Sequence, residues 1–342
     1  LDKNSIRLTI SAVSSLKNIG DSKAIKPLMN ILTSNAEGMV ICTAIEALTE
    51  LDPANAKEML VRMLSHPDEH VKQRSADILG NLRVASAADA LLHAMPDDFK
   101  YTHISIIFAL AKIGDQRVFD TTLSMLQLET RMESKKIGKN PDQYRDVDVN
   151  RSRREWAANA FGILGDPRAI EPLAKALDDG YVAISASTSL GLLGDDRGVE
   201  YLLSRLKSAD KEIQRKVIHG LSEIKDSRSA RPIIEILRNT SYIQDETSIR
   251  ELISTLANIG NEEVIAELTS IMQEDGEQAF TAAKQLTRIG HEGAIEYLYE
   301  RVINNPEELH IFSLFDYHEI KHPRIIDLLL FMLNHQSAKT RI

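Results

Sequence analysis

The stretch GILGDPRAIEPLAKALDD, residues 162–179, joins the end of one predicted helix to the start of another. Gly165 can adopt the left-handed conformation that ends a helix, because it has no Cβ. Asp166 can cap the next helix, and Pro167 fits its first position, where no N–H is needed. A Gly-rich turn before a helix can also bind phosphate. If the turn recurs along the chain, it is a connection between helices rather than a single binding site.

Turns related to this one recur along the chain, and we call their central residues the anchors. The anchors are Gly20, Asp52, Arg83, Gly114, Gly165, Gly194, Lys225, Gly260, Gly290 and Lys321. They are separated by 32, 31, 31, 51, 29, 31, 35, 30 and 31 residues. Leu or Ile stands eight residues after every anchor, with Thr122 as the exception, and another apolar residue follows four positions later. This spacing predicts an amphipathic helix after each turn.

Each repeat is therefore a hairpin of two antiparallel helices, of which the first is rich in small residues, as in WAANAFGIL (156–164). Small residues allow neighbouring helices to approach closely. One hairpin cannot bury its apolar side alone, so the repeats must stack. We expect an all-α fold, a right-handed α-solenoid of about ten repeats that forms a single array over residues 1–342.

The sequence GDPRAIEPLAKAL, with its echoes GDSKAIKPLMNIL, GDQRVFDTTLSML and GDDRGVEYLLSRL, resembles the HEAT-like repeats first grouped around the phycobilin lyases. The resemblance covers nearly the whole chain. It implies the fold above, with the second helices lining a concave face. It implies no single function, because that family includes adaptors, scaffolds, lyase subunits, a di-iron hydroxylase and relatives of DNA glycosylases.

Composition narrows the classes of partner. The chain has 41 basic and 50 acidic residues and a net charge of −9, which argues against general nucleic-acid binding. Its single cysteine, Cys42, fits a reducing compartment and the expectation of a cytoplasmic protein. No apolar run is long enough for a membrane span. The closing HQSAKTRI resembles the start of another first helix, so we expect further repeats beyond Ile342.

The 51-residue interval contains an insertion at about residues 129–150, ETRMESKKIGKNPDQYRDVDVN, followed by RSRREW. Long loops of this kind often carry function. A basic cluster with a nearby tyrosine could bind an acidic segment of a protein partner, and its residues are Lys135, Lys136, Lys139, Tyr144, Arg151 and Arg153. The alternative is a solvated loop followed by a helix in which Arg154 is an ordinary family residue and Trp156 packs between repeats.

Charged residues also recur at fixed distances from the anchors, and we call these two rows the charge ladder. The third position after the anchor includes Lys23, Arg117, Arg168, Arg197, Arg228 and Arg324. The sixth includes Glu58, Asp89, Asp120, Glu171, Glu200, Arg231, Glu296 and Asp327. An Arg in the first turn of a helix opposes the helix dipole, so something else must favour it. One interpretation is that each Arg pairs with an acid in its own or the next repeat, and the other is that the ladder forms a polar groove for a protein segment. The two are compatible, because a ladder can hold the array and still exchange partners at its ends.

Two local motifs resemble metal sites and fail on geometry. HEIKH (318–322) matches the zinc pattern H-E-x-x-H, but Pro323 biases His322 away from helix. DVDVN (146–150) resembles a calcium loop without its required Gly and Glu. Cys42 stands in an apolar helix and should be inert. We predict neither a metal, a cofactor nor a catalytic residue.

These observations predict a non-catalytic protein-binding scaffold or adaptor that presents the charge ladder on a concave surface, together with the insertion. The alternative is a phycobilin-lyase-like subunit that assists chromophore attachment, which rests on the resemblance alone. Recognition of DNA lesions would need a positive concave face, and the mixed signs of the ladder argue against it.

Overall fold

The computed structural model describes residues 3–34, 36–96, 101–136, 144–208, 210–239, 246–274, 276–304 and 322–334. The chain divides into two compact units, unit 1 over Leu1–Asp195 and unit 2 over Asp196–Ile342. Among the described helices, none has the length and apolar character needed to cross a bilayer. A single continuous array remains a prediction.

Unit 1 consists of helical hairpins and one inserted β-hairpin. Its first helices are α1 (Lys3–Ile19), α3 (Gly38–Leu51), α5 (Glu69–Asn81), α7 (Tyr101–Ile113), α9 (Arg151–Leu164) and α11 (Ala183–Leu192). Its second helices are α2 (Ile25–Leu32), α4 (Pro53–Met63), α6 (Ala88–His93), α8 (Phe119–Leu126) and α10 (Ile170–Ala176). The strands β1 (Met132–Lys136) and β2 (Tyr144–Asp148) lie between α8 and α9.

Unit 2 continues the same alternation of helices. Its first helices are α13 (Lys211–Ile224), α15 (Glu246–Ile259) and α17 (Glu277–Arg288). Its second helices are α12 (Asp196–Arg205), α14 (Ala230–Arg238), α16 (Glu262–Met272), α18 (Glu292–Asn304) and α19 (Pro323–Asn334). The segment before α19, where the first helix of the tenth repeat is predicted, and the closing HQSAKTRI lie outside the described residues. The fold is an all-α solenoid of stacked hairpins.

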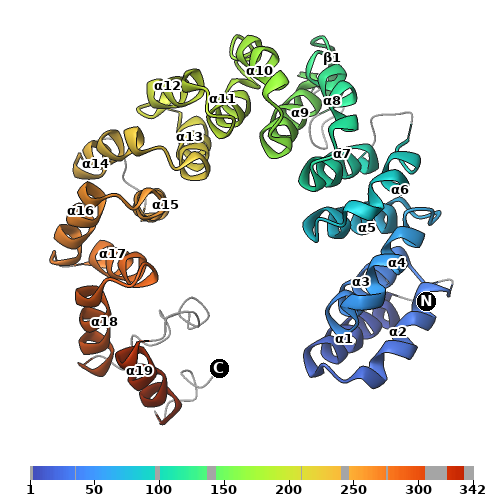
Figure 1. Cartoon of the computed structure of the whole chain (residues 1–342), viewed down its shortest axis with the longest axis horizontal. Helices are drawn as coiled ribbons and strands as arrows, with labels where there is room; N and C mark the ends of the chain where they lie inside the picture. The colour runs from blue at the N-terminus through green and yellow to red at the C-terminus, as the bar shows by residue number, and fades with distance from the viewer. Residues whose placement is uncertain are drawn as a thin grey trace. The chain divides into compact units, whose positions relative to one another are not determined.

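The first helices form one layer of each unit and the second helices the other. In each unit taken by itself, the row of helices is curved and the first helices lie on its inner side, as α3 and α5 do in unit 1 and α13 and α15 in unit 2 (Figure 1). The prediction that the second helices line the concave face was therefore wrong. The small residues explain the difference, because helices that carry them pack closely and their layer becomes the inner one.

The turns between the helices have the predicted chemistry. Left-handed backbone is found at most described anchors, namely Gly20, Arg83, Gly114, Gly165, Gly194, Lys225, Gly260 and Gly290. Asp52 differs, with a φ of −141°, because α3 ends at Leu51 and the Asp52 side chain directly caps α4. In other turns the Asp after the anchor caps a short 3₁₀ turn, as Asp166 caps Pro167–Ala169 by accepting from the N–H of Arg168.

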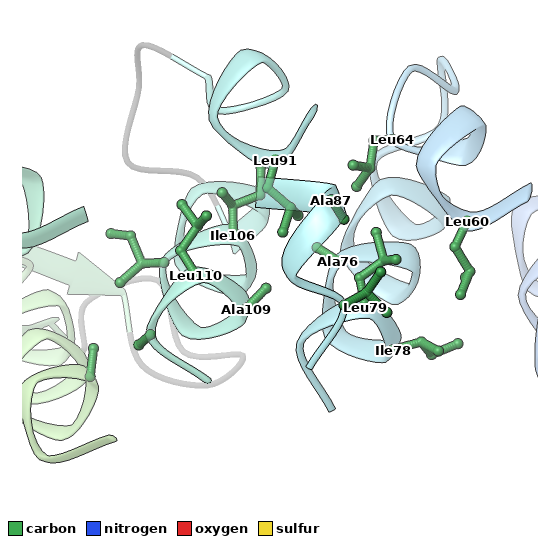
Figure 2. Packing of buried hydrophobic residues seen from close by; sticks show 14 of the residues in the cluster. Leu60, Leu64, Ala76, Ile78, Leu79, Ala87, Leu91, Ile106, Ala109 and Leu110 are labelled. Carbon is green, nitrogen blue, oxygen red and sulfur yellow. The ribbon is translucent and has the colours of Figure 1, made fainter. Parts of the chain in front are cut away.

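The apolar residue eight positions after the anchor lies in the core of its repeat. Leu60, Leu91 and Leu173 are fully buried at this position, and Thr122 is buried with its hydroxyl bonded to the carbonyl of Val118. Figure 2 shows Leu91 of α6 in one cluster with Leu79 of α5 and Ile106 of α7. The apolar stripes of neighbouring hairpins thus cover one another.

Glycines on the first helices set the spacing of the inner layer. A Cβ added at Gly80 in α5 would lie 2.6 Å from Ala109 Cα in α7. A Cβ added at Gly162 in α9 would lie 2.6 Å from Ser189 Oγ in α11. That Oγ donates a 2.8 Å hydrogen bond to the carbonyl of Ala158, so the close approach also brings a polar link between neighbouring repeats.

Replacing Lys225 by Gly should stabilise the protein by about 1 kcal/mol, because Lys225 has a φ of 58° and a Cβ is unfavourable there. Urea unfolding followed by circular dichroism measures the change. Lys225→Ala keeps the Cβ and is the matched control. If Lys225→Gly were no more stable than Lys225→Ala, backbone strain at this anchor would be refuted.

Gly80→Ala should destabilise the protein by about 1–3 kcal/mol, because the added methyl group meets the backbone of α7. Gly180→Ala provides a comparison at a glycine with no atom near the added Cβ, and it should change stability by less than about 1 kcal/mol. Thermal and urea unfolding measure both. Equal effects of the two substitutions would contradict the close approach of α5 and α7.

Candidate functional site

The insertion contains an antiparallel β-hairpin. Its pairing register runs from Met132 opposite Asp148 to Lys136 opposite Tyr144, with Lys135 directly opposite Arg145. The sequence analysis treated this segment as a loop and predicted no strands there. A two-stranded hairpin is marginally stable alone, so its position depends on how its base is held.

The base of the hairpin is held by a buried ion pair. Arg154 in the first turn of α9 donates from Nη2 to Asp148 Oδ2 at 2.6 Å, and only 6% and 4% of the two side chains are exposed. Its Nε donates to Asp179 Oδ2 at 2.9 Å, and its Nη1 donates to the carbonyl of Leu128 at 3.3 Å. Arg154 thus joins both sides of the insertion to α9 and to the segment between α10 and α11.

The other oxygen of Asp148 is also engaged. Asp148 Oδ1 accepts from the backbone N–H groups of Arg131 and Asn150, at 3.1 and 3.0 Å. The Asn150 side chain donates to the carbonyl of Glu129 at 2.9 Å, which closes the base. Burial acts to raise the pKa of Asp148, but the hydrogen bonds from Arg154 and the two N–H groups outweigh it, so the pKa lies below its ordinary value.

The predicted contact residues of the insertion have different positions. Lys135 lies in β1, with Lys136 at its end, and Tyr144 begins β2, whereas Lys139 lies outside the described residues. Arg151 and Arg153 are half-buried at the start of α9. The Arg151 guanidinium stacks 4.5 Å from the ring centre of Tyr181, and Arg153 Nη1 donates to Asn150 Oδ1 at 3.0 Å. Arg151 therefore already contacts the body of unit 1, and Arg153 contacts the end of the insertion.

A small open cleft lies beside the buried ion pair. It has a volume of about 190 Å³, and Arg154, Lys175 and Asp179 are its charged lining residues. Leu126, Pro172 and Val182 line its apolar part. The Arg154 guanidinium already donates to two carboxylates and a carbonyl. The charged groups of this cleft therefore serve to hold the insertion in place.

In the turns at Gly114, Gly165 and Lys225, the charge ladder begins with a contact inside the turn. Arg168 Nε and Nη2 both donate to the carboxylate of Asp166, the capping residue two positions earlier. Arg117 with Asp115 and Arg228 with Asp226 show the same arrangement. Hydrogen bonding to the Arg lowers the pKa of each of these carboxyl groups, against the effect of burial. This pairing explains why Arg is found in the first turn of a helix despite the dipole.

The ladder also links neighbouring repeats. The third position of one repeat meets the sixth position of the repeat before it, in Arg117 with Asp89 at 2.7 Å and in Arg324 with Glu296 at 3.1 Å. Arg231 with Glu263 at 3.3 Å is the same pair with its charges exchanged. Arg228 instead reaches Asp196 at 2.8 Å. Of the two sequence-based alternatives, pairing within and between repeats is confirmed for these residues.

Other ladder residues have individual surroundings. Arg168 stacks 4.0 Å from the ring centre of Phe119 in the preceding repeat. Glu171 and Arg197 are engaged in interactions of their own. Glu200 is exposed on α12. The ladder thus lies at the starts of the second helices and in their turns, and the second helices form the outer layer of each unit (Figure 1).

The remaining motifs supply no metal centre in the described part of the chain, where no cluster of three or more His, Cys, Asp or Glu side chains is placed to hold an ion. His322 directly precedes α19, and its Nδ1 accepts from the N–H of Arg324, whereas His318 lies outside the described residues. Cys42 is half-buried, and burial, with Asp68 and Glu46 nearby, raises the pKa of its thiol. A raised pKa disfavours the reactive thiolate.

Residues 25–111 and 178–252 match the family described as HEAT repeats, and residues 153–179 match the PBS lyase HEAT-like repeat. This is a HEAT-repeat chain. The matched segments include the joint at Gly165 and the α9–α10 hairpin that holds the insertion.

Solved structures with a similar arrangement of helices include the complex of CpcE and CpcF of phycocyanin lyase from Nostoc sp. PCC7120. It has a TM-score of 0.45 and 19% identity, and the alignment covers 71% of this chain and 92% of that chain. YibA of E. coli has a TM-score of 0.41 and 16% identity, with coverage of 81% and 96%. No curated protein matches the HEAT-repeat chain.

Sequence reasoning missed the role of Arg154, which it treated as an ordinary family residue. Its partners Asp148 and Asp179 lie six residues before it and 25 residues after it, so no local motif joins them. A usable signal was present, because the insertion ends in two acids just before an Arg-rich helix start. The insertion of this HEAT-repeat chain is thus held by side chains from separate segments, Asp148 of β2, Arg154 of α9 and Asp179 after α10.

Arg154→Met should destabilise the HEAT-repeat chain by about 3 kcal/mol, because it leaves Asp148 buried without its cation. Urea unfolding measures the loss. Arg168→Met removes an exposed Arg that pairs within its own turn, so its effect should be much smaller. Comparable losses for both variants would show that the pair at the insertion is no more important than a surface ion pair.

Stability should also depend on pH through Asp148. Its pKa is lower in the folded state than in the unfolded state, so its contribution is present at neutral pH and declines as the pH falls below about 4. The difference in unfolding free energy between the native chain and Asp148→Asn should therefore shrink from about pH 6 to about pH 3. A difference that stays constant over this range would refute the assignment.

Proposed function

We propose that this HEAT-repeat chain is a non-catalytic protein-binding scaffold whose inserted β-hairpin contacts an acidic segment of a protein partner. The observation that carries the proposal is the buried Arg154–Asp148 pair. It fixes a hairpin that is no part of the repeat stack. Burying two charges is costly even when they are paired, so a segment anchored in this way is better explained by a role in contact than by a solvated loop.

The hairpin offers both main-chain and charge complementarity. Among the residues that the structure describes, its sheet has two strands, each paired with the other along one edge, and an unpaired strand edge can accept an extended segment from another chain. Lys135 stands directly opposite Arg145. The strands also carry Lys136, so the hairpin is rich in basic residues, whose charge is complementary to that of an acidic segment. Met132, of which 57% is exposed, adds an apolar contact at the base.

The charge ladder has a different proposed role. Its arginines are bonded to acids of their own turn and of the preceding repeat, so we assign the ladder to holding neighbouring repeats in register. A partner that bound there would have to replace these bonds. The main contact is therefore assigned to the insertion.

A phycobilin-lyase-like subunit is the second candidate. It is favoured by one observation, the match of residues 153–179 to the PBS lyase HEAT-like repeat. The chain would then hold an apoprotein while a chromophore is attached. Co-production with bilin and a phycobiliprotein subunit tests this, because attached bilin gives visible absorbance. A coproduct without that absorbance would exclude this activity.

Affinity capture from the native extract tests the scaffold proposal. The bait is the intact chain, compared with a variant in which residues 133–147 are replaced by a short Gly-Ser linker. Lys135→Glu together with Lys136→Glu reverses two charges of the hairpin. Lys57→Glu together with Arg62→Glu reverses two exposed charges on α4 and is the matched control.

We expect the linker variant and the hairpin variant to lose the same proteins, and the α4 variant to retain them. Circular dichroism confirms folding of each bait. If all baits captured the same proteins in equal amounts, the hairpin would have no part in partner binding and the proposal would be wrong.

A further inference from the structure

A second polar site lies in unit 2, between the first helices α13 and α15. The two helices leave an open cleft of about 500 Å³, a volume within the range of ligand sites. Its lining residues are Arg215, Ile218, His219, Ser222, Thr247, Arg250, Glu251, Ser254 and Thr255. All but Ile218 carry a polar side chain, although carbon atoms supply the larger share of the lining surface, so the cleft offers both polar groups and apolar contact area.

Basic groups come from both walls of this cleft. Arg215 and His219 lie on α13, with 58% and 75% of their side chains exposed, and Arg250, which is exposed and already engaged in an interaction of its own, lies on α15. Guanidinium groups bind carboxylates through paired N–H donors. Ser222 on α13 and Ser254 on α15 add hydroxyl groups that can donate to the same oxygens. The cleft therefore combines cations and hydroxyl donors from facing helices.

Acidic groups near the cleft limit what it can bind. Glu212 lies 3.9 Å from Arg215 and Glu223 lies 3.5 Å from His219, but neither lines the cleft. Glu251 is the acid among the lining residues. A nucleic-acid backbone carries a charge at every nucleotide and would meet Glu251 as well as the arginines. A peptide can place its carboxylates opposite the arginines and leave an uncharged residue opposite Glu251.

We propose that the α13–α15 cleft binds an acidic peptide segment, with Arg215 and Arg250 as the groups that recognise Asp or Glu side chains. The helices that line the cleft, α13 and α15, belong to the first-helix layer on the inner side of unit 2 (Figure 1), whereas the inserted hairpin belongs to unit 1. The inference rests on the proposed function in one respect, that the partner is a protein. It assigns a second contact site with its own chemistry.

Fluorescence anisotropy with a short labelled peptide of alternating Gly and Glu tests the cleft. A peptide of alternating Gly and Gln and a single-stranded oligodeoxynucleotide of equal length are the comparison probes. Arg215→Gln with Arg250→Gln is the cleft variant. Arg205→Gln with Lys207→Gln removes the same charge from the C-terminal end of the second helix α12 and the residues after it, outside the ladder, and is the matched control.

We expect saturable binding of the Glu peptide that weakens about tenfold or more in the cleft variant and stays near native in the control. Glu251→Gln removes the acid that lines the cleft and should strengthen binding, which keeps the test informative if the double variant folds poorly. Equal losses in both double variants, no saturable binding, or tighter binding of the oligonucleotide would overturn the proposal.

The hairpin-replaced chain separates the two proposals. The cleft residues are unchanged in it, so saturable binding of the Glu peptide should remain, and Arg215→Gln with Arg250→Gln should still weaken that remaining binding about tenfold or more. If hairpin replacement leaves partner capture intact but the cleft results hold, the proposal for the insertion fails alone. If the peptide binds the hairpin-replaced chain at least tenfold more weakly, the hairpin rather than the cleft is the acidic-peptide site.

Discussion

The structure depends on one constraint, that a single helical hairpin cannot cover its own apolar side. Leu60, Leu91 and Leu173 are buried because a neighbouring hairpin closes over each of them. The same constraint explains the close approach of Gly80 to Ala109. Neighbouring first helices can share a core only if they pack closely, and a glycine at this contact allows it. The turns recur at a regular interval because the stacked hairpins must keep a regular spacing. The residues of the charge ladder recur at the same interval because they lie at fixed distances from the turns.

This dependence decides how much could be predicted from the sequence. The repeat period, the left-handed anchors and the capping Asp residues are local patterns, and they predicted the hairpins and most of their turns. Which layer of helices lies on the inner side could not be predicted from such local patterns, because it depends on the spacing in the first-helix layer relative to that in the second-helix layer. The small residues of the first helices contain that information, but only when the two layers are compared, and the family expectation assigned the layers in reverse.

The polar sites also divide into those that local sequence patterns predicted and those that only the structure shows. The ladder could be located from the sequence, and pairing between repeats was one of the two alternatives. The choice needed the structure, because Asp115 and Arg117 pair only when the turn brings their side chains together. The buried pair of Arg154 and Asp148 was not predicted, although the insertion ends in acids just before an Arg-rich helix start, and the cleft between α13 and α15 joins segments with no shared motif.

The reversed pair of Arg231 and Glu263 gives the repeats of unit 2 a fixed order. Similar repeats are prone to loss and duplication by unequal recombination of their coding sequence. If the repeat that contains Arg231 were lost, Glu263 would face Glu200, the residue at the sixth position of the preceding repeat. Two carboxylates would then meet where an ion pair stood. The exchange of charges at this one pair thus disfavours an array that has lost the repeat, because the newly adjacent repeats would have like charges at their contact.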